Sequence, residues 1–412
     1  MERRPLEGVT ILDFGWVIAA PYGTRLLRDM GARVVRLETG TRVDPARLDT
    51  RRPGSDWREE GGWAYYDNNH CKIDLCLNLK SEKGKEILYR LIPQVDVVVS
   101  NYAPRAFHKL GIDYETLKEK REDIIVINAS GLGDTGPYRD YATYAPIMQC
   151  LSGMTSLIGY EGEDPFGYSG IAADYIGGIA IAALVASALY HRRKTGEGMF
   201  LDMSSTESTL AMMGVPFLQY QINGKLMTPT GDHHYLHQMA PHNCYRCAGE
   251  DNWCVIAAGS GEEWENFKNA LRSECSWVDD ERFSTLEGRL ANQSVLDEKI
   301  SQWTRDQDKK ELVKKLQNSG VSAAMVQDGW ETLHDEHCGE TGYFQTLDFG
   351  EGERRPRYVK ITNNIIHIAS MPPEKYDVLS GQLGSGNEYV LREMLHMKDS
   401  EIEAAEQDRA FI

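Results

Sequence analysis

The first third of the chain alternates between short apolar runs and longer segments in which apolar residues recur with helical spacing. The apolar runs predict strands, and the segments with a period near 3.6 residues predict helices. The predicted strands are residues 9–14, 32–38, 73–79, 95–99 and 124–128, and the predicted helices are 21–30, 82–91 and 114–119. Strands and helices that alternate in this way indicate an α/β fold with a doubly wound, mostly parallel sheet. Such sheets bind ligands at the carboxyl ends of their strands.

The longest apolar run begins at Gly170 and lasts to Tyr190. It is about long enough to cross a membrane, but Asp174, Gly177 and Gly178 within it favour a helix buried in a large protein. Because a bare buried charge is very costly, the carboxylate of Asp174 must be neutralised, solvated in a cavity or held for chemistry. It could equally cap the helix, since a helix N-terminus stabilises an anionic carboxylate. Both roles can hold at once.

The composition changes after Ser204. A helix over 207–213 and a linker within 216–230 lead to a smaller α/β domain, for which we expect the bounds 231–321. Its predicted elements are a strand over 253–257 and helices over 262–271, 296–304 and 309–318. Residues 1–215 then form the first part of a large domain.

Composition narrows the functional class. A chain of 412 residues is too long for one ordinary core, so two domains are expected. Its net charge of −17 disfavours general binding to nucleic acid or to anionic membranes, although a local basic pocket for a phosphorylated ligand remains open. No secretory signal precedes the first strand, and the eight cysteines are scattered, so we expect a cytoplasmic protein.

One glycine motif is a weak indication of a dinucleotide. Residues 131–136 match G-x-G-x-x-G and follow a predicted strand. A dinucleotide fingerprint also opens a helix packed on that strand, whereas Pro137 and the next few residues are typical of a turn. We therefore place nicotinamide binding below the alternative developed next.

A second motif is a weak indication of zinc. His237, His242, Cys244 and Cys247 are zinc-type ligands. No second pair of ligands lies at a regular distance, and alternation along a strand explains the cysteines more simply. We expect no metal site.

A series of motifs runs in order along nearly the whole chain. They are residues 5–9, 19–21, 27–38, 44–47, 69–72, 77–80, 101–105, 110–111, 130–137, 149–153, 174–178 and 389–412. In this order they resemble the class III CoA-transferases, the family of formyl-CoA:oxalate and carnitine CoA-transferases. The resemblance implies that residues 322–412 return to complete the large domain. It also implies a dimer of two interlocked rings, formed by two identical chains or by two related ones.

The resemblance makes Asp174 the catalytic nucleophile. In that family the carboxylate attacks an acyl-CoA thioester to form a mixed anhydride, and the released CoA then forms a thioester with the protein. The acceptor acid next takes the CoA through a second anhydride, so one difficult exchange becomes several easier steps. The implied ligands are an acyl-CoA and a small carboxylic acid, with CoA as part of the substrate and no tightly bound cofactor.

The resemblance also implies the residues that bind CoA. They are Asn69, Lys72, Asn101, Tyr102, Arg105 and Lys109. Cations in strand-end loops suit phosphates, which agrees with this assignment, but a single Lys or Arg is more often a solvated surface charge.

Several positions depart from the oxalate enzyme and predict a differently shaped acyl pocket. Trp16 and Ile18 replace a His and a Gln, Thr39 and Ala142 replace two cations, and residues 233–238 replace a glycine-rich loop. We expect the pocket to be lined by Trp16, Ile18, Tyr144, His233, His234 and Tyr235. Bulky and aromatic groups favour a larger, partly apolar acid over oxalate. An aromatic or dicarboxylic acid of the benzylsuccinate type, with succinyl-CoA as donor, fits best.

Two other functions stay open. The α-methylacyl-CoA racemases share this fold and pair the aspartate with a histidine, but that position here is Tyr144. A tyrosine with a pKa of about 10 is a poor base at neutral pH, which favours the transferase. A non-catalytic partner subunit is the other alternative. Asp174 counts against it, while the departures at Trp16, Ile18, Thr39 and Ala142 count for it.

Overall fold

The computed structural model describes residues 4–48, 62–167, 170–233, 238–348, 357–363, 365–366, 368–369, 371, 376 and 381–412. The chain divides into two compact units. The first comprises Met1–Thr155, Tyr168–Lys225 and His337–Ile412, and the second comprises Ser156–Gly167 and Leu226–Glu336. Each unit has its own hydrophobic core.

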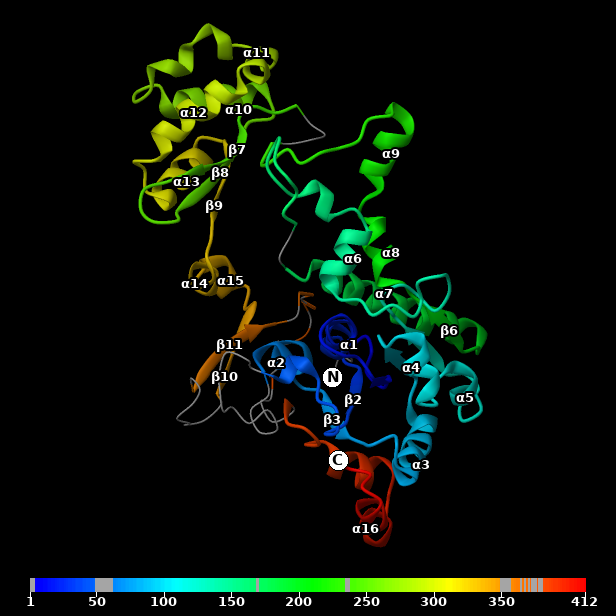
Figure 1. The fold of residues 1–412 in the computed structure, drawn as a ribbon. Coiled ribbons are helices and arrows are strands. Elements are labelled where there is room, and N and C mark those ends of the chain that lie inside the picture. Colours follow the sequence, from blue (N-terminus) through cyan, green and yellow to red (C-terminus); the bar gives the residue numbers. More distant parts are fainter. Residues whose placement is uncertain are drawn as a thin grey trace. The chain divides into compact units, whose positions relative to one another are not determined.

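A six-stranded parallel sheet forms the centre of the first unit (Figure 1). Its strands, in the order β3-β2-β1-β4-β5-β6, are β1 (Thr10–Asp13), β2 (Arg33–Glu38), β3 (Ile73–Cys76), β4 (Val97–Ser100), β5 (Ile125–Asn128) and β6 (Met199–Asp202). The order reverses between β1 and β4, which creates the switch point where such sheets bind ligands. The doubly wound α/β fold expected from the sequence is confirmed.

Helices cover the sheet, which explains why the inner strands are apolar on both faces. The helices of the first unit are α1 (Ala19–Asp29), α2 (Trp63–Asn69), α3 (Glu82–Leu91), α4 (Pro104–Lys109), α5 (Tyr114–Lys118), α6 (Ala145–Leu151), α7 (Ala172–Thr195), α8 (Ser205–Ala211), α9 (Gly214–Asn223) and α16 (Asp399–Gln407). Apolar residues of α1 and α7 pack with one face of the sheet. Those of α3, α5 and the C-terminal segment pack with the other.

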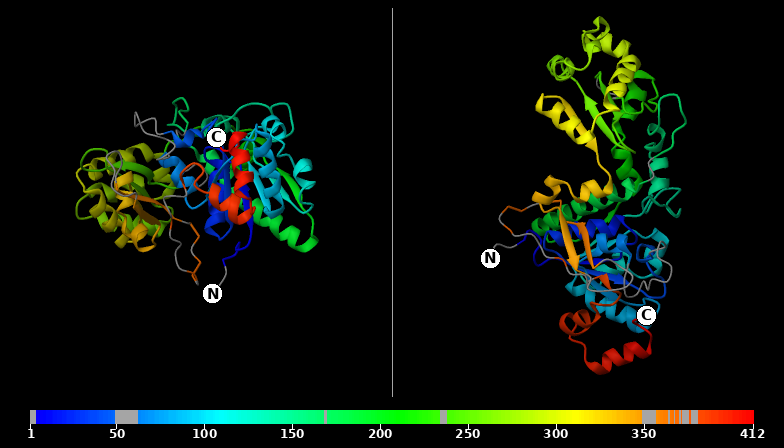
Figure 2. Two further views of the ribbon diagram at one scale, coloured as in Figure 1. Left: turned by 90° about the horizontal axis from the view of Figure 1, so that it is seen from below. Right: turned by 90° about the vertical axis from the view of Figure 1, so that its left-hand side faces the viewer.

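The C-terminal segment completes the first unit. A short π-helix, Tyr389–Met394, and α16 add Val390, Leu391 and Ala405 to the core beside α3. The backbone N–H of Asn78 also donates to the carbonyl oxygen of Ala410 at 2.7 Å. Figure 2 shows the red C-terminal helices against the blue and cyan part of this unit. The large domain is therefore built from both ends of the chain, as expected.

Helix α7 has 24 residues, and an 18-residue stretch of it has a mean hydropathy of 1.8, so by length and composition it could cross a membrane. It is the one helix of the described residues that passes this test. Its buried residues include Gly177, Gly178, Ile181 and Val185, which pack on α1 and the sheet. A core helix of a folded protein passes the same test.

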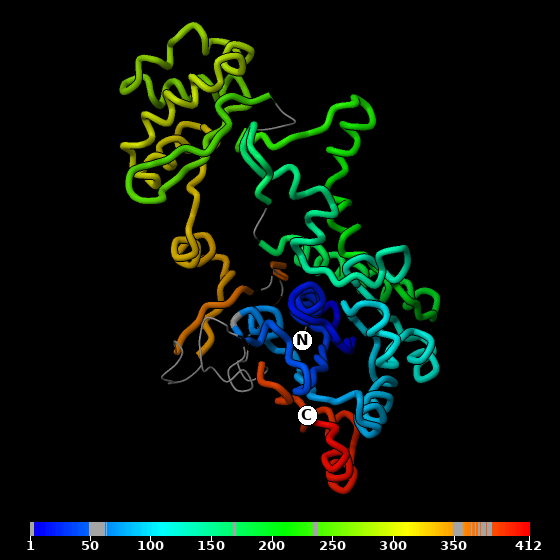
Figure 3. The backbone as a smooth tube through the Cα atoms, in the orientation of Figure 1, coloured from blue at the N-terminus to red at the C-terminus, as the bar shows by residue number. Residues whose placement is uncertain are grey.

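The second unit has a small antiparallel sheet covered by helices. Figure 3 traces its backbone, mostly in green and yellow. The sheet contains β7 (His242–Arg246), β8 (Trp253–Ala257) and β9 (Ser322–Val326), and the helices are α10 (Gly261–Leu271), α11 (Leu286–Ala291), α12 (Gln293–Thr304), α13 (Lys309–Asn318) and α14 (Gly329–Leu333). Trp264, Phe267, Leu296 and Ile300 form much of its core. The smaller α/β unit matches the expected fold.

Two expected boundaries differ from the structure. Strand β9 pairs with β8, with Met325 opposite Cys254, so the chain stays in the second unit to Glu336 rather than leaving it after residue 321. Helix α9 also occupies much of the linker expected at 216–230. The chain then re-enters the first unit through α15 (Glu336–Glu340) and the hairpin strands β10 (Phe344–Asp348) and β11 (Tyr358–Thr362).

Candidate active site

A cavity of about 560 Å³ lies in the first unit at the carboxyl ends of the parallel strands. Its wall includes the segments that follow β1, β2, β3, β4 and β5, together with Asp174 and Ser205. The lining includes Trp16, Val17 and Ala19 after β1, Thr39 to Asp44 after β2, Asn101 to Ala103 after β4, and Ala129 to Gly131 after β5. The cavity therefore occupies the edge of the sheet at which the sequence predicts a ligand.

Asp174 lies in the first turn of α7 on the cavity wall. Among the residues that the structure describes, its carboxylate has no hydrogen-bond donor and no cation as partner. Burial alone raises the pKa of this carboxyl group from 3.8 to about 6. The capping role that the sequence also allowed is wrong, since Ile171 is at the cap position and α7 has no side-chain cap. An ionised Asp174 is thus a poorly solvated carboxylate with no partner among the described residues.

Close packing between α7 and α1 fixes Asp174 in place. A Cβ atom on Gly178 would lie 2.8 Å from the carbonyl oxygen of Ala19, and one on Gly23 would lie 2.7 Å from the carbonyl oxygen of Gly178. Only glycine fits at these two positions. Asp174 is four residues, about one helical turn, before Gly178, so the start of α1 and Asp174 are held together.

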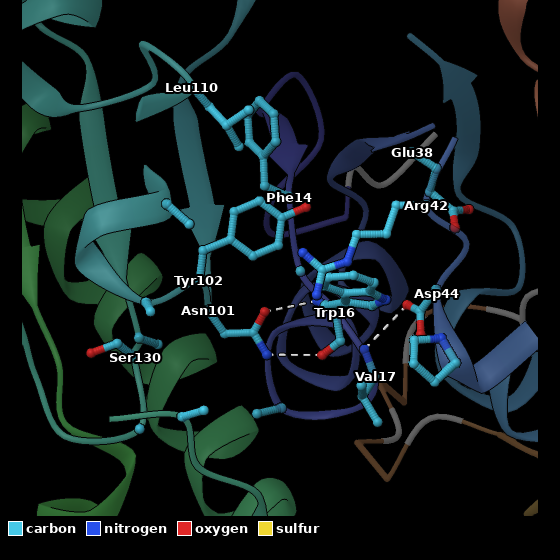
Figure 4. Close-up of a pocket in the computed structure, with 18 of the residues that line it drawn as sticks. Phe14, Trp16, Val17, Glu38, Arg42, Asp44, Asn101, Tyr102, Leu110 and Ser130 are labelled. Atoms are coloured by element: carbon cyan, nitrogen blue, oxygen red, sulfur yellow. Dashed lines mark hydrogen bonds between the residues drawn. The ribbon is translucent and has the colours of Figure 1, made fainter. Parts of the chain in front are cut away.

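The loop before α1 is strained and firmly held (Figure 4). Val17 has φ of 63°, a conformation that β-branched residues rarely adopt. The N–H of Trp16 donates to Oδ1 of Asn101 at 2.7 Å, Nδ2 of Asn101 donates to the carbonyl oxygen of Trp16 at 2.8 Å, and the N–H of Val17 donates to Oδ2 of Asp44 at 3.1 Å. Such strain persists where the surroundings over-determine it, often at functional sites.

Charged residues buried beneath this loop support it. Arg36 pairs with Asp44 at 2.7 Å and donates to the carbonyl oxygen of Gly15 at 2.6 Å. Burial works to lower the pKa of the Arg36 guanidinium, but its neighbours, Tyr65 and Glu38 first among them, raise it well above its usual value. Arg36 is therefore a fixed cation already committed to the protein.

Two of the residues expected to bind CoA lie in this buried layer instead. Nζ of Lys72 donates to Asp13 at 2.9 Å, to Asn69 at 2.8 Å and to the carbonyl oxygen of Pro21 at 2.8 Å. Burial lowers the pKa of Lys72 to about 8. Lys72 and Asn69 are almost fully buried and do not line the cavity, so they support the floor of the site.

The other four expected CoA contacts divide into two pairs. Asn101 and Tyr102 line the cavity, and burial raises the pKa of Tyr102 to about 12. Arg105 and Lys109 are exposed on α4 and do not line it. The cavity wall on this helix is formed by Ala106.

The residues expected in the acyl pocket are also dispersed. Trp16 and Tyr144 line the cavity, whereas Ile18 is buried behind it. His233 belongs to the second unit, where its ring lies 3.0 Å from Asp297. His234 and Tyr235 are outside the described residues.

Arg42 is a cavity residue that the sequence analysis missed. Its guanidinium carbon lies 4.2 Å from the centroid of the Trp16 ring, and both side chains line the cavity. The sequence could have indicated Arg42 as a ligand-binding candidate, because it is a cation in the loop that follows the second strand, at the ligand-binding edge of the sheet.

The glycine motif of residues 131–136 does not open a helix, and His237 of the zinc-type motif lies outside the described residues. The segment after Gly136 is a turn, and the next helix, α6, begins only at Ala145. In the part of the chain that the structure describes, no three His, Cys, Asp or Glu side chains are grouped to hold a metal ion.

Comparisons with known proteins show what the chain as a whole is similar to. The model of CoA-transferase family III matches residues 6–377. The chain is 29% identical to the succinyl-CoA–D-citramalate CoA-transferase of Chloroflexus aurantiacus, over 97% of this chain and 96% of that one. It is 28% identical to the succinate–glutarate CoA-transferase of Agrobacterium fabrum, over 95% and 96% of the two chains. Its fold matches a CAIB/BAIF family protein from Brucella suis with a TM-score of 0.82 and 24% identity, over 96% and 100% of the two chains.

Proposed function

Since this chain belongs to CoA-transferase family III, and so is an enzyme that transfers CoA between an acyl-CoA and an acid, we propose that Asp174 carries CoA between two dicarboxylic acids, with succinyl-CoA as donor. The observation that carries this proposal is the state of the Asp174 carboxylate. It lies on the wall of the cavity, has no partner within the described structure, and has its pKa raised to about 6 by burial. At neutral pH it is ionised and free to attack.

The reaction proceeds in four steps, and in each step one bond to a carbonyl carbon forms while another breaks. An Asp174 oxygen attacks the thioester carbonyl carbon, the C–S bond breaks, and CoA leaves as a thiolate with a mixed anhydride on the protein. The thiolate then attacks the aspartyl carbonyl and releases the donor acid as a carboxylate, which leaves CoA bound to Asp174 as a thioester. The acceptor carboxylate repeats these two steps in reverse. No net proton is gained or lost, and the Asp174 carboxylate is regenerated.

The surroundings of Asp174 suit this sequence of steps. The glycine contacts between α1 and α7 hold the carboxylate in place, and fixed placement of reacting groups contributes on the order of 7–11 kcal/mol to such reactions. The partly buried position also limits access of water, which would hydrolyse both anhydrides.

The substrate class rests on the relatives and on the cavity. The two relatives named above act on succinyl-CoA with D-citramalate and on succinate with glutarate. The aromatic side chains of Trp16, Tyr102 and Tyr144 line the cavity here. A dicarboxylic acid with an apolar carbon skeleton is the acceptor that agrees both with the names of the relatives and with the aromatic lining of the cavity.

The racemase alternative is disfavoured by the structure of this cavity. Tyr144 stands where the racemases have their histidine, and it is 60% exposed. The described cavity wall therefore has no histidine at the position of the second base that a racemase needs.

Chemical trapping tests the nucleophile. The wild-type chain is incubated with succinyl-CoA, treated with borohydride or hydroxylamine, and digested for mass spectrometry. We expect label on the peptide that contains Asp174, and none in Asp174→Asn. Exchange of the substrate α-proton without any adduct would assign the chain to the racemases instead. Activity that appears only after a second, related chain is added would assign it to a hetero-oligomer.

We also propose that the first unit pairs with a second chain. Helices α7 and α9 expose large apolar side chains, including Ile179 on α7 and Leu218 and Ile222 on α9, with 52%, 55% and 74% of their surface accessible. Large apolar side chains exposed in such numbers on two helices suit burial against a second chain. Light scattering of the pure chain distinguishes a homodimer from a monomer that awaits a related subunit.

A further inference from the structure

Arg42 is held in the cavity by stacking rather than by a countercharge. Its guanidinium lies over the Trp16 ring (Figure 4), and in the described part of the chain its side chain has no hydrogen bond or ion pair. Trp16 is itself fixed, since both its N–H and its carbonyl oxygen bond to Asn101. Stacking on an aromatic face orients a guanidinium and leaves its N–H groups free to donate.

The other cations of the cavity wall differ from Arg42. Among the described residues that line it, they are Arg36, Lys80 and Arg139. Arg36 is already bound to Asp44, and Arg139 lies 3.7 Å from Asp140. Lys80 is exposed in the loop after β3 and, like Arg42, has no carboxylate partner among the described residues.

Two uncommitted cations thus face a substrate that carries two kinds of anion. An ammonium group acts as a point charge and suits the phosphates of CoA. A planar guanidinium matches the two oxygens of a carboxylate and can bind both at once. The Trp16 ring beneath Arg42 adds an apolar surface for a short carbon chain, and it belongs to the loop that leads into α1, next to the turn that holds Asp174.

We propose that Arg42, stacked on Trp16, binds the distal carboxylate of a dicarboxylic acyl group and so selects dicarboxylic over monocarboxylic substrates. This inference rests on the proposed function and names the residue that sets its substrate class. Lys80 and the remaining polar wall are left for the nucleotide part of CoA.

Isotope exchange tests the proposal without knowledge of the natural acceptor. Succinyl-CoA is mixed with labelled succinate, butyryl-CoA is mixed with labelled butyrate, and the rate at which label enters the CoA ester is measured. The two acyl groups have the same carbon chain, but only succinyl carries a second carboxylate. The variants are Arg42→Met, which keeps the length and removes the charge, and Arg42→Lys, which keeps the charge and removes the planar fork. Lys80→Met is the matched control.

The wild type should exchange succinate faster than butyrate. Arg42→Met should lower kcat/KM for succinyl-CoA roughly 10- to 100-fold, as for loss of a hydrogen-bonded charge, and leave butyryl-CoA within about twofold. For succinyl-CoA, kcat/KM of Arg42→Lys should lie between the values of the wild type and of Arg42→Met. Lys80→Met should change both donors by the same factor.

Three results would overturn the assignment. The first is an equal loss of kcat/KM for both donors in Arg42→Met, which would place Arg42 at the CoA phosphates. The second is no loss of kcat/KM for either donor in Arg42→Met. The third is a wild type that exchanges succinate no faster than butyrate. If the wild type, like Asp174→Asn, exchanges neither acid, the proposed function itself fails. Arg42 is then judged by binding alone, and an equal affinity of wild type and Arg42→Met for succinyl-CoA rejects it.

Discussion

The side-chain amide of Asn101 makes two hydrogen bonds to the backbone of Trp16. Its Oδ1 accepts from the backbone N–H at 2.7 Å, and its Nδ2 donates to the backbone carbonyl oxygen at 2.8 Å. Asn101 follows β4, and Trp16 follows β1, the two neighbouring strands at which the sheet order reverses. The pair therefore joins the two halves of the sheet at the ligand-binding edge. Because its amide is committed to Trp16, we expect Asn101 to act on a ligand mainly through the loop that it holds.

Replacing Asn101 by Asp should loosen this loop. The carboxylate can still accept from Trp16 N–H, but it would face the Trp16 carbonyl oxygen with no proton to donate. We expect a loss of about 1–3 kcal/mol in the free energy of unfolding and a higher KM for the acyl-CoA. Asn223→Asp at the exposed end of α9, where the amide donates to Gln219, is the control and should change neither quantity. Urea denaturation and steady-state kinetics measure both, and an unaltered KM in Asn101→Asp would remove the positioning role.

The rate of the first chemical step should depend on the ionisation of Asp174. Burial raises the pKa of this carboxyl group to about 6, and only the carboxylate attacks. The rate at which the trapped adduct forms should therefore be constant above about pH 7 and fall tenfold for each pH unit below about 5.5. Single-turnover trapping from pH 4.5 to pH 8.5 measures this. A profile that stays flat down to pH 4.5 contradicts the raised pKa.

The same pKa predicts that the nucleophile destabilises the fold at neutral pH. The folded-state pKa is raised above the ordinary 3.8, so the favourable contribution of the protonated group is present at low pH and lost as the pH rises through about 6. The gap between 3.8 and about 6 corresponds to about 3 kcal/mol at most. Asp174→Asn should therefore be more stable than the wild type by up to about 3 kcal/mol at pH 8, and the difference should shrink toward pH 4. Denaturation of both proteins at the two pH values decides it, and a variant that is less stable at pH 8 would falsify the prediction.

The contact between α1 and α7 should tolerate no side chain at Gly178. A methyl group there would lie 2.8 Å from both the Ala19 carbonyl oxygen and the Tyr22 ring. Gly178→Ala should cost about 1–3 kcal/mol of stability and slow the formation of the Asp174 adduct, because the helix that carries Asp174 must shift. Gly214→Ala in α9 meets nothing within 4 Å and should be neutral in both measurements. Equal behaviour of the two variants would show that this packing does not set the position of Asp174.

Much of the fold follows from local patterns in the sequence. The helix over 82–91 and the strand over 253–257 have the expected bounds, because Ser81 caps the helix and alternating Cys254 and Ile256 bury one face of the strand. The sequence pattern could not assign β9 to the second unit. A short strand of small residues pairs equally well with either sheet by pattern alone. Only its register with β8 reveals its place.

A site residue was predictable from the sequence where its environment is set by neighbours in the chain. It was unpredictable where its partners are distant in the sequence. Asp174 stands out because a carboxylate at the start of an apolar helix must be exposed to a cavity or neutralised. Lys72 looked like a ligand for phosphate, but its charge is taken up by Asp13, 59 positions earlier in the chain. Arg42 and Trp16 meet only because two strand-end loops converge, which no spacing in the sequence reveals.

Lys72 should act on stability far more than on affinity for CoA. It is almost fully buried and neutralises Asp13, while Asn69 and the Pro21 carbonyl oxygen accept its other protons. Lys72→Met leaves the Asp13 carboxylate buried beside Arg36 alone, and loss of one member of a buried pair costs about 3–5 kcal/mol. Lys83→Met removes an exposed pair with Glu86 and should cost less than about 1 kcal/mol. A direct CoA contact predicts the opposite result for Lys72→Met, a fold of unchanged stability with a KM for acyl-CoA raised at least tenfold. Urea denaturation with kinetics on the folded fraction therefore separates a residue that supports the floor of the site from one that binds the ligand.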